Sequence, residues 1–271
     1  MFVPVDQINA ELAAFSAEGL GHRVAVPPTG GAVRSLAENV NRTLERLEEA
    51  RDRERRFVSD ASHDLRNPIS GLQMQLELML EEPPDADWKP MASAALRDAE
   101  RLTAILDDLL ELSRLDARAP STAETLDLSA LARREVERRA PRVPVETRLE
   151  PGVTVRANRV RLARVLNNLL NNAERHAESR VRVTVATQGA DAVLEVLDDG
   201  PGVPEHARER IFERFSRLPE SRELDPGGTG LGLPIAREIA EYYGGSLRVE
   251  DGPRGARFVL RLPLVSSETP R

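Results

Sequence analysis

The residue best suited to nucleophilic chemistry is His63, which stands within Phe57-Val58-Ser59-Asp60-Ala61-Ser62-His63-Asp64-Leu65-Arg66-Asn67-Pro68-Ile69. Imidazole is largely neutral near pH 7, and its nitrogen is a competent nucleophile. The carboxylate of Asp64 can orient and polarise the ring, and Asn67 follows one helical turn later on the same face. A lone histidine on an exposed helix face is the simpler interpretation, unless other segments of the chain supply matching chemistry.

An asparagine-rich segment, Arg164 to His176, offers neutral oxygen ligands. Asn168 and Asn172 lie one turn apart on a predicted helix, and two amide oxygens on one face suit Mg²⁺ shared with water and substrate phosphates. Arg175 can contact phosphate. Because Asn is a poor helix former, four asparagines in so short a helix indicate a role beyond filling the surface.

Two glycine-containing loops are candidates for the walls of a nucleotide site. In Asp198-Asp199-Gly200-Pro201-Gly202 the glycines allow a ligand to approach the backbone, and Asp198 can accept a hydrogen bond from an adenine amino group. The loop Gly227-Gly228-Thr229-Gly230-Leu231-Gly232-Leu233 precedes a predicted helix, whose free N–H groups and positive end can hold phosphates. Either loop alone is a weak signal. The segment 211–217 between them is either a lid over nucleotide or a short helix packed on the sheet.

Apolar residues at helical spacing predict the elements that position His63. Helices are expected from Pro4 to Phe15, from about Ala32 to Glu81 along a near-heptad seam, and from about Lys89 to Asp116. The last two form a hairpin that cannot bury both apolar stripes by itself. A second copy would complete a four-helix bundle, so a homodimer is expected. The alternative is a single-chain hairpin packed on its own C-terminal domain.

After a linker at about residues 117–125, the pattern changes to mixed α/β. Helices are predicted near 128–139, 159–177 and 232–243, and strands near 145–149, 153–156, 181–187, 192–197, 246–249 and 256–262. This order predicts an α/β sandwich, in which one sheet is faced by helices.

Composition excludes several classes of function. The 271 residues include no cysteine, which rules out disulfides and cysteine-bound metals. A net charge of −7 makes nucleic acid an unexpected partner. No signal peptide is recognisable, and no stretch reaches the ~20 apolar residues that span a bilayer. Lys89 is the only lysine, so cationic contacts to phosphate are expected from arginine.

Together these segments resemble the bacterial sensor histidine kinases. The run around His63 resembles their phospho-acceptor box. Residues 164–176, 198–204, 211–217 and 227–233 resemble, in order and spacing, the N, G1, F and G2 boxes of their ATP-binding domain, where G1 and G2 are the two glycine boxes. That domain is a GHKL-type α/β sandwich shared with gyrase, MutL and heat-shock chaperone ATPases. The resemblance covers residues 57–264 and departs mildly at Asp199, where Asn is frequent, and at Pro234, where a small residue is usual.

The resemblance implies an activity, its cofactors and its site residues. His63 would take the γ-phosphoryl group of Mg²⁺–ATP and pass it to an aspartate of a cognate response regulator, with a second activity as that regulator's phosphatase. Catalytic roles are implied for His63, Asp64 and Asn67, and Mg²⁺ binding for Asn168 and Asn172. The implied nucleotide-binding residues are Asn168, Asn172, Arg175, Asp198, Gly200, Gly202, Gly228, Thr229, Gly230, Leu231, Gly232 and Leu233.

The N-terminal part resembles a HAMP signal-relay domain, on the strength of Pro4, the connector residues Arg23 and Val24, and Asn41 in the second helix. Gly31 and Ala32 stand where that family commonly has an acidic residue. Because such a domain usually follows a transmembrane helix, membrane attachment is expected only through a part that is not in this chain, with the chain in the cytoplasm at the inner face of the membrane.

The fold class expected is therefore α plus α/β. The expected divisions are a HAMP-like segment at 1–52, a dimerisation and phospho-acceptor hairpin at 53–117, a linker at 118–126, an ATP-binding domain at 127–265 and a tail at 266–271.

Two other functions stay open at this stage. The first is a plain ATPase of the same fold, which drives a conformational clamp without a phosphorylated intermediate; the complete box around His63 argues against it. The second is a non-catalytic dimeric signalling scaffold, against which Asn172, Asp198 and the glycines of 227–233 argue. Labelling chemistry separates the first from a kinase, and ATP affinity separates the second.

Overall fold

The computed structural model describes residues 23–26, 31–81, 87–117, 121–216 and 229–265. The chain divides into two units, residues 1–66 and 67–271. The predicted helix from Pro4 to Phe15, the glycines Gly227 and Gly228 and the tail 266–271 lie outside the described residues.

The first unit contains most of helix α2 (Ala32–Glu81), which is continuous through Pro68 into the second unit. The predicted limits of this helix are confirmed. A short connector precedes it, and Val24 of that connector is buried against Ala37 and Val40. The side-chain amide of Asn41 accepts a hydrogen bond from the Val24 N–H at 2.8 Å and donates one to the Val24 carbonyl at 2.9 Å. One amide thus satisfies both backbone groups of Val24, and this holds the connector on α2.

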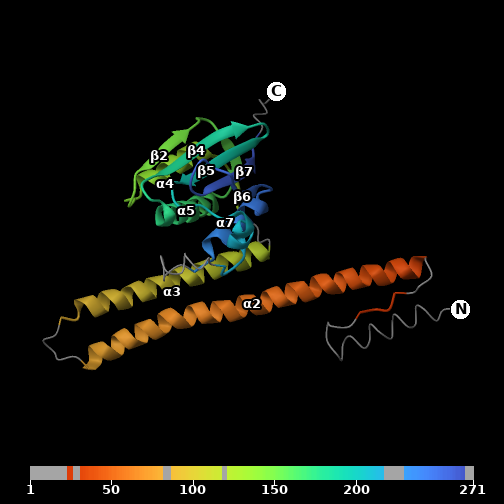
Figure 1. Cartoon of the computed structure of the whole chain (residues 1–271), viewed down its shortest axis with the longest axis horizontal. Coiled ribbons are helices and arrows are strands. Elements are labelled where there is room, and N and C mark those ends of the chain that lie inside the picture. Colours follow the sequence, from red (N-terminus) through yellow and green to blue (C-terminus); the bar gives the residue numbers. More distant parts are fainter. Residues whose placement is uncertain (1–22, 27–30, 82–86, 118–120, 217–228, 266–271) are drawn as a thin grey trace. The chain divides into compact units, whose positions relative to one another are not determined.

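In the second unit, the C-terminal end of α2 and helix α3 (Lys89–Asp116) form an antiparallel hairpin (Figure 1). A proline in the first turn of α3 suits that position, because the N–H that proline lacks would have no helical partner there. Gly71 permits close packing, since a Cβ at this position would lie 2.7 Å from the Asp98 carboxylate. The predicted return helix is confirmed at both ends.

The α/β part has a main sheet of five strands in the order β2-β4-β5-β7-β6. These strands are β2 (Val145–Leu149), β4 (Val181–Gln188), β5 (Asp191–Asp198), β6 (Ser246–Glu250) and β7 (Arg257–Pro263). β2 pairs with β4 in parallel, and the other neighbours are antiparallel. Helices α4 (Leu128–Glu137), α5 (Arg159–His176) and α7 (Gly232–Tyr242) cover one face (Figure 1). The predicted sandwich is confirmed.

The prediction of a single sheet was incomplete. β1 (Glu124–Asp127) pairs antiparallel with β3 (Thr154–Ala157) in a separate two-stranded sheet. The sequence had placed β1 in a linker, because its four residues bury only Leu126 and show no alternation that distinguishes them from a loop. The pairing joins segments about thirty residues apart, which local pattern does not report.

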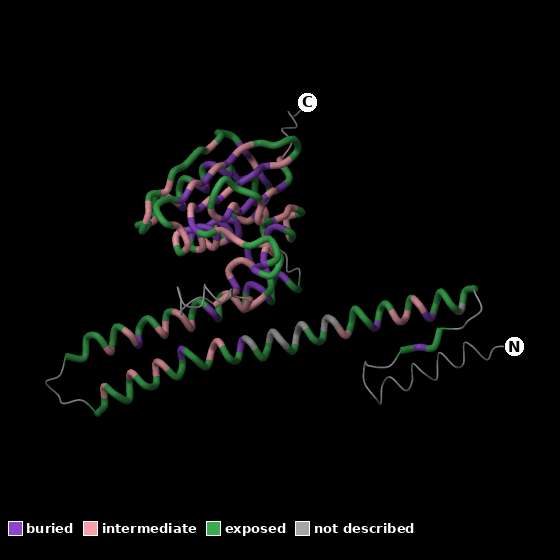
Figure 2. The backbone as a smooth tube through the Cα atoms, viewed as in Figure 1, coloured by how far each residue is buried: buried purple, intermediate pink, exposed green. Residues whose placement is uncertain are grey.

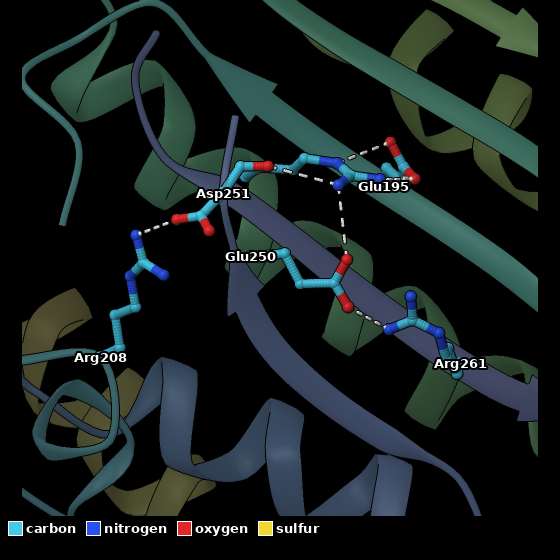
Figure 3. Close-up of polar contacts among 6 residues, drawn as sticks. Glu195, Arg208, Glu250, Asp251 and Arg261 are labelled. Carbon is cyan, nitrogen blue, oxygen red and sulfur yellow. Dashed lines mark hydrogen bonds and ion pairs between the residues drawn. The ribbon is translucent and has the colours of Figure 1, made fainter. Parts of the chain in front are cut away.

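Burial separates the two faces of the main sheet. Along β4 and β5, buried residues such as Val183 and Val196 alternate with partly exposed ones (Figure 2). The face away from the helices carries ion pairs: Arg257 binds Glu195 and Glu250, and Arg261 binds Glu250 (Figure 3). These ion pairs surround the buried Val193 and Val259 on this face, whereas the functional candidates of the domain lie on the helical side.

Candidate nucleotide-binding site

The site is built by helix α5, the C-terminal end of β5 and the start of α7. The Asn158 side chain caps α5 by accepting hydrogen bonds from the Val160 and Arg161 N–H groups at 2.9 and 3.2 Å. The buried face of α5 then repeats apolar residues at helical spacing and anchors the helix on the sheet. Its other residues, Asn168 and Asn172 among them, are positioned as a consequence.

Asp198 lies at the end of β5 and is 2% exposed. Its Oδ1 accepts hydrogen bonds from the Gly200 and Ala256 N–H groups at 3.0 and 3.1 Å. Its Oδ2 is buried and has no hydrogen-bond partner among the described residues. Burial raises the pKa of this carboxyl, while the two backbone N–H groups oppose the increase. A buried acceptor without a donor carries a cost that a ligand's N–H can remove.

Two glycines next to Asp198 approach neighbouring backbone atoms so closely that no side chain would fit. A Cβ at Gly200 would lie 2.1 Å from the His176 carbonyl oxygen, and one at Gly255 would lie 1.9 Å from the Asp198 carbonyl oxygen. Gly255 also has a φ of +78°, which L residues rarely adopt. Gly200 was singled out in the sequence, whereas Gly255 was missed, because it stands just before β7 and far from either glycine loop along the chain.

Three of the four asparagines of α5 divide between two structural tasks. Asn167 and Asn171 accept hydrogen bonds from Arg139, which also pairs with Glu174. These two asparagines therefore hold the end of α4. Asn168 instead donates from its side-chain amide to the Gly232 carbonyl at 2.8 Å, which joins α5 to the first residue of α7.

The start of α7 packs directly against Asn168. A Cβ at Gly232 would lie 3.3 Å from the Asn168 Cγ. The Thr229 hydroxyl oxygen accepts from the Leu231 N–H at 3.2 Å, and Leu231 is fully buried. Gly230 has a φ of +67° and its carbonyl accepts from the Phe215 N–H at 3.1 Å. The structure thus brings Asn168, Thr229, Gly230 and Gly232 together. Pro234 is accommodated in the first turn of α7, where it is buried.

The remaining predicted residues are more exposed. Asn172 is half-buried one turn after Asn168, Gly202 has a φ of +79°, and Arg175 is exposed. Leu233 is half-buried in the first turn of α7.

Asp199, which stands where the family frequently has Asn, has a structural role. Its carboxylate accepts hydrogen bonds from the Glu178, Ser179 and Arg180 N–H groups and from the Ser179 hydroxyl. These bonds, that of the Ser179 hydroxyl first, lower its pKa far below the usual value. Asp199 therefore fixes the turn that follows α5, a role that the sequence did not reveal.

For segment 211–217 the sequence allowed either a lid over nucleotide or a short helix packed on the sheet, and the described residues of this segment favour the helix. Residues Arg210–Phe212 form a short 3₁₀ helix, η2, in which Ile211 and Phe212 are buried. The Phe212 ring meets Phe258 of β7 edge-on at 6.4 Å, and the Arg237 guanidinium stacks 4.0 Å from its centroid. This segment is a short helix packed on the sheet side of the domain, and residues 217–228 lie outside the described part of the chain.

His63 belongs to the first unit, and its side chain is 72% exposed. Its Nδ1 lies 3.6 Å from Asp64 Oδ1, a separation at which the carboxylate acts on the ring electrostatically rather than through a direct hydrogen bond. Asn67 is exposed. An accessible imidazole beside a carboxylate can act as a nucleophile towards an incoming phosphoryl group.

Within the described ranges, no group of three or more His, Cys, Asp and Glu side chains is arranged to hold a metal ion. No described helix is long and apolar enough to cross a membrane.

Comparison with known families identifies both parts of the chain. Residues 157–266 match the family of histidine kinase-, DNA gyrase B- and HSP90-like ATPases, which defines the class of the α/β domain. Residues 53–118 match the histidine kinase A phospho-acceptor domain, which contains His63. The chain therefore belongs to the sensor histidine kinases.

Two curated relatives and one solved structure agree with this assignment. The signal transduction histidine-protein kinase AfsQ2 of Streptomyces coelicolor is 35% identical over 84% of this chain and 45% of its own length. The histidine-protein kinase/phosphatase MprB of Mycobacterium sp. is 35% identical over 84% of this chain and 47% of its own length. The chain thus spans about half the length of these relatives.

The structure of histidine kinase ThkA, solved in complex with the response regulator protein TrrA, superposes with a TM-score of 0.60 at 23% identity. The match covers 82% of this chain and 67% of the ThkA chain. At this identity the likeness concerns the fold alone.

Proposed function

We propose that the chain is an ATP-dependent protein histidine kinase that phosphorylates its own His63 and passes the phosphoryl group to an aspartate of a response regulator. The observation that carries the proposal is Asp198, whose buried Oδ2 has no partner among the described residues and is bordered by glycines. A buried carboxylate oxygen of this kind suits the exocyclic amino group of adenine. A scaffold without nucleotide has no use for it.

The nucleotide would lie between Asp198 and the start of α7. Gly200, Gly202, Thr229, Gly230, Leu231, Gly232 and Leu233 would shape the pocket around it, together with Gly228, which lies outside the described residues. Asn168 and Asn172 would hold Mg²⁺ through their amide oxygens, and the Asn168 oxygen is available because its bond to Gly232 uses the amide nitrogen. Mg²⁺ supplies neutralisation of phosphate charge, and Arg175 would add to it from the exposed face of α5.

In the proposed reaction, His63 Nε2 attacks the γ-phosphorus of ATP. A nitrogen–phosphorus bond forms, the bond from the γ-phosphorus to the bridging oxygen breaks, and ADP leaves with that electron pair. Asp64 stabilises the positive charge that develops on the ring, since its carboxylate lies 3.6 Å from Nδ1. Asn67, exposed one turn further along α2, would orient the water that removes phosphate from the regulator in the phosphatase direction.

The kinase would act as a homodimer. Apolar side chains on the hairpin of the second unit are uncovered in the single chain: Leu80 is 86% exposed, Leu96 61% and Leu110 54%. A second hairpin would bury them in a four-helix bundle. A response regulator would dock on the same bundle, as the kinase/phosphatase activity of the relative MprB and the regulator-bound structure of ThkA suggest by similarity.

The proposed division of the chain is a HAMP-like segment at 1–52, the phospho-acceptor hairpin at 53–117, a linker at 118–126, the ATP-binding domain at 127–265 and a tail at 266–271. The two hydrogen bonds between the Asn41 side chain and the Val24 backbone support the HAMP-like segment. By its likeness to sensor kinases, the chain would work in the cytoplasm at the inner face of the membrane.

The test is incubation with Mg²⁺ and γ-labelled ATP, followed by acid or alkali treatment of the protein. We expect a label that is stable in alkali and lost in acid, present in the wild type and absent from His63→Gln. His206→Gln is the matched control, because it removes another exposed imidazole and should keep the label. ATP hydrolysis without protein-bound label would support the clamp ATPase instead, and a label retained in His63→Gln would refute His63 as the acceptor.

A further inference from the structure

Among the described residues, three acidic side chains of helix α3 pair with arginines of the ATP-binding domain. Asp108 pairs with Arg164, Glu111 with Arg161 at 2.8 Å, and Asp116 with Arg214 at 2.7 Å. The pairs differ in their surroundings, and the difference points to different roles.

The pair of Glu111 and Arg161 is structural. Both side chains are about nine-tenths buried, and the Arg161 guanidinium also stacks 4.7 Å from the Tyr242 ring centroid. Asp116 and Arg214 lie at the end of α3, where Arg214 also binds Glu238. Neither pair includes a residue of the glycine loop.

The Asp108 pair lies at the phosphate end of the candidate site. Its carboxylate pairs with Arg164, and the nearby hydroxyl of Thr229, which belongs to the glycine loop, also acts to lower its pKa. Arg164 stands one turn before Asn168 on α5, so its side chain lies on the same side of the helix as an amide proposed to hold Mg²⁺. Asp108 is only 17% exposed and Arg164 26%. The burial of the carboxylate raises its pKa, an effect that the bond to Arg164 opposes.

An arginine guanidinium and a threonine hydroxyl both donate hydrogen bonds to phosphate oxygens. Carboxylate oxygens are also negatively charged acceptors, so a carboxylate can take the place of a phosphate at these donors. Lys89 is the sole lysine, so an arginine is the expected cation at a phosphate in this chain. We propose that Arg164 is a phosphate-binding residue for ATP, and that Asp108 of α3 occupies Arg164 until nucleotide displaces it. This rests on the proposed function, because it requires ATP in the site beside Asp198.

The consequence is a competition between an internal anion and the nucleotide's phosphates. Phosphate binding frees Asp108 and so removes one of these three ion pairs, whereas the buried pair of Glu111 and Arg161 stays in place. ATP affinity is then lower than the site could provide, because each binding event breaks a charge-assisted bond. Such a bond is worth on the order of a factor of ten in an equilibrium constant.

The experiment is calorimetric titration of the full chain with Mg²⁺ and a non-hydrolysable ATP analogue. Asp108→Asn should bind about tenfold more tightly than the wild type, since the competing charge is gone. Asp107→Asn is the matched control: it removes the same charge from the adjacent, exposed position and should leave affinity within about twofold. Arg164→Gln should bind more weakly, and the double variant Asp108→Asn/Arg164→Gln should gain nothing over it.

Equal affinity of Asp108→Asn and the wild type would overturn the proposal, as would an equal gain in Asp107→Asn, which would indicate a general charge effect. A gain from Asp108→Asn that persists in the double variant would remove Arg164 from the phosphate site and overturn it as well. If Asp108→Asn does not fold, as judged by thermal unfolding, Asp108→Ser tests the same loss of charge. A wild-type chain that binds no nucleotide refutes the proposed function, an outcome distinct from binding that Asp108 does not alter.

Discussion

The substitution Asp198→Asn tests the nucleotide site with the least disturbance to the fold. Asp198 Oδ1 accepts from the Gly200 and Ala256 N–H groups, both of which are donors and need an oxygen. In an asparagine the amide oxygen must therefore take the Oδ1 position, and the amide nitrogen must take the position of the buried Oδ2. The substitution thus replaces an acceptor with a donor at the one atom that faces the expected adenine amino group.

The magnitude follows from two losses. A hydrogen bond to a charged group contributes about 1.5–3 kcal/mol, and two donors left facing each other without water cost about 1–3 kcal/mol more. Their sum is about 3 kcal/mol or more, which weakens ATP binding by a factor of ~100 or more. The unliganded domain should unfold at the same temperature as the wild type or higher, because the variant keeps both backbone hydrogen bonds and no longer buries a charge.

The assay is ATP titration by calorimetry, with thermal unfolding measured in parallel. Asp191→Asn, at the opposite end of β5, makes the same change of charge outside the site and should bind ATP like the wild type. Asp198→Asn binding ATP within about threefold of the wild type would refute the assignment of Oδ2 to adenine. A large fall in the unfolding temperature would instead show that Asp198 is a structural residue.

Two further predictions concern the loops around this site. Asp199 has a depressed pKa in the folded chain, so its contribution to stability is complete above the unfolded value of about 3.9 and declines as pH falls further. The difference in unfolding free energy between the wild type and Asp199→Asn, measured by urea titration, should be constant from about pH 5 to 7 and shrink below about pH 4; a difference that grows there would contradict this role. Gly255→Ala should destabilise the domain severely and abolish ATP binding, because its Cβ would collide with Asp198, whereas Gly152→Ala, at a φ of +76° with no atom within 4 Å, should cost only about 1–2 kcal/mol. Equal losses of stability in the two variants would show that the close approach to Asp198 is unimportant.

The local elements were predictable because their causes lie within short stretches of chain. The apolar spacing of 32–81 and 89–116 and the prolines after Glu81 suffice to predict α2 and α3. Valines that alternate with polar residues likewise predict β4. β1 was missed because its four residues become a strand only by pairing with β3, and that pairing is a long-range contact.

The candidate site was likewise predictable from sequence only in part. Residue type and order along the chain were enough to single out His63, Asn168, Asn172, Asp198 and the glycines, because nucleophilic, oxygen-donor and close-approach roles each need a particular side chain or none at all. Sequence alone could not separate Asn167 and Asn171, which hold Arg139, from Asn168, which holds Gly232, because all four lie on one helix and only its neighbours distinguish their faces.

The sequence by itself determined the helices, most strands and the chemistry available to the chain. Only the tertiary structure decided that Asp198 keeps one buried oxygen without a partner among the described residues, that Asp199 caps a turn, and that Asp108 of α3 reaches Arg164. The physical reason is that burial and ion pairing depend on which surfaces meet in space, and residues 108 and 164 meet only after two separate helices have packed.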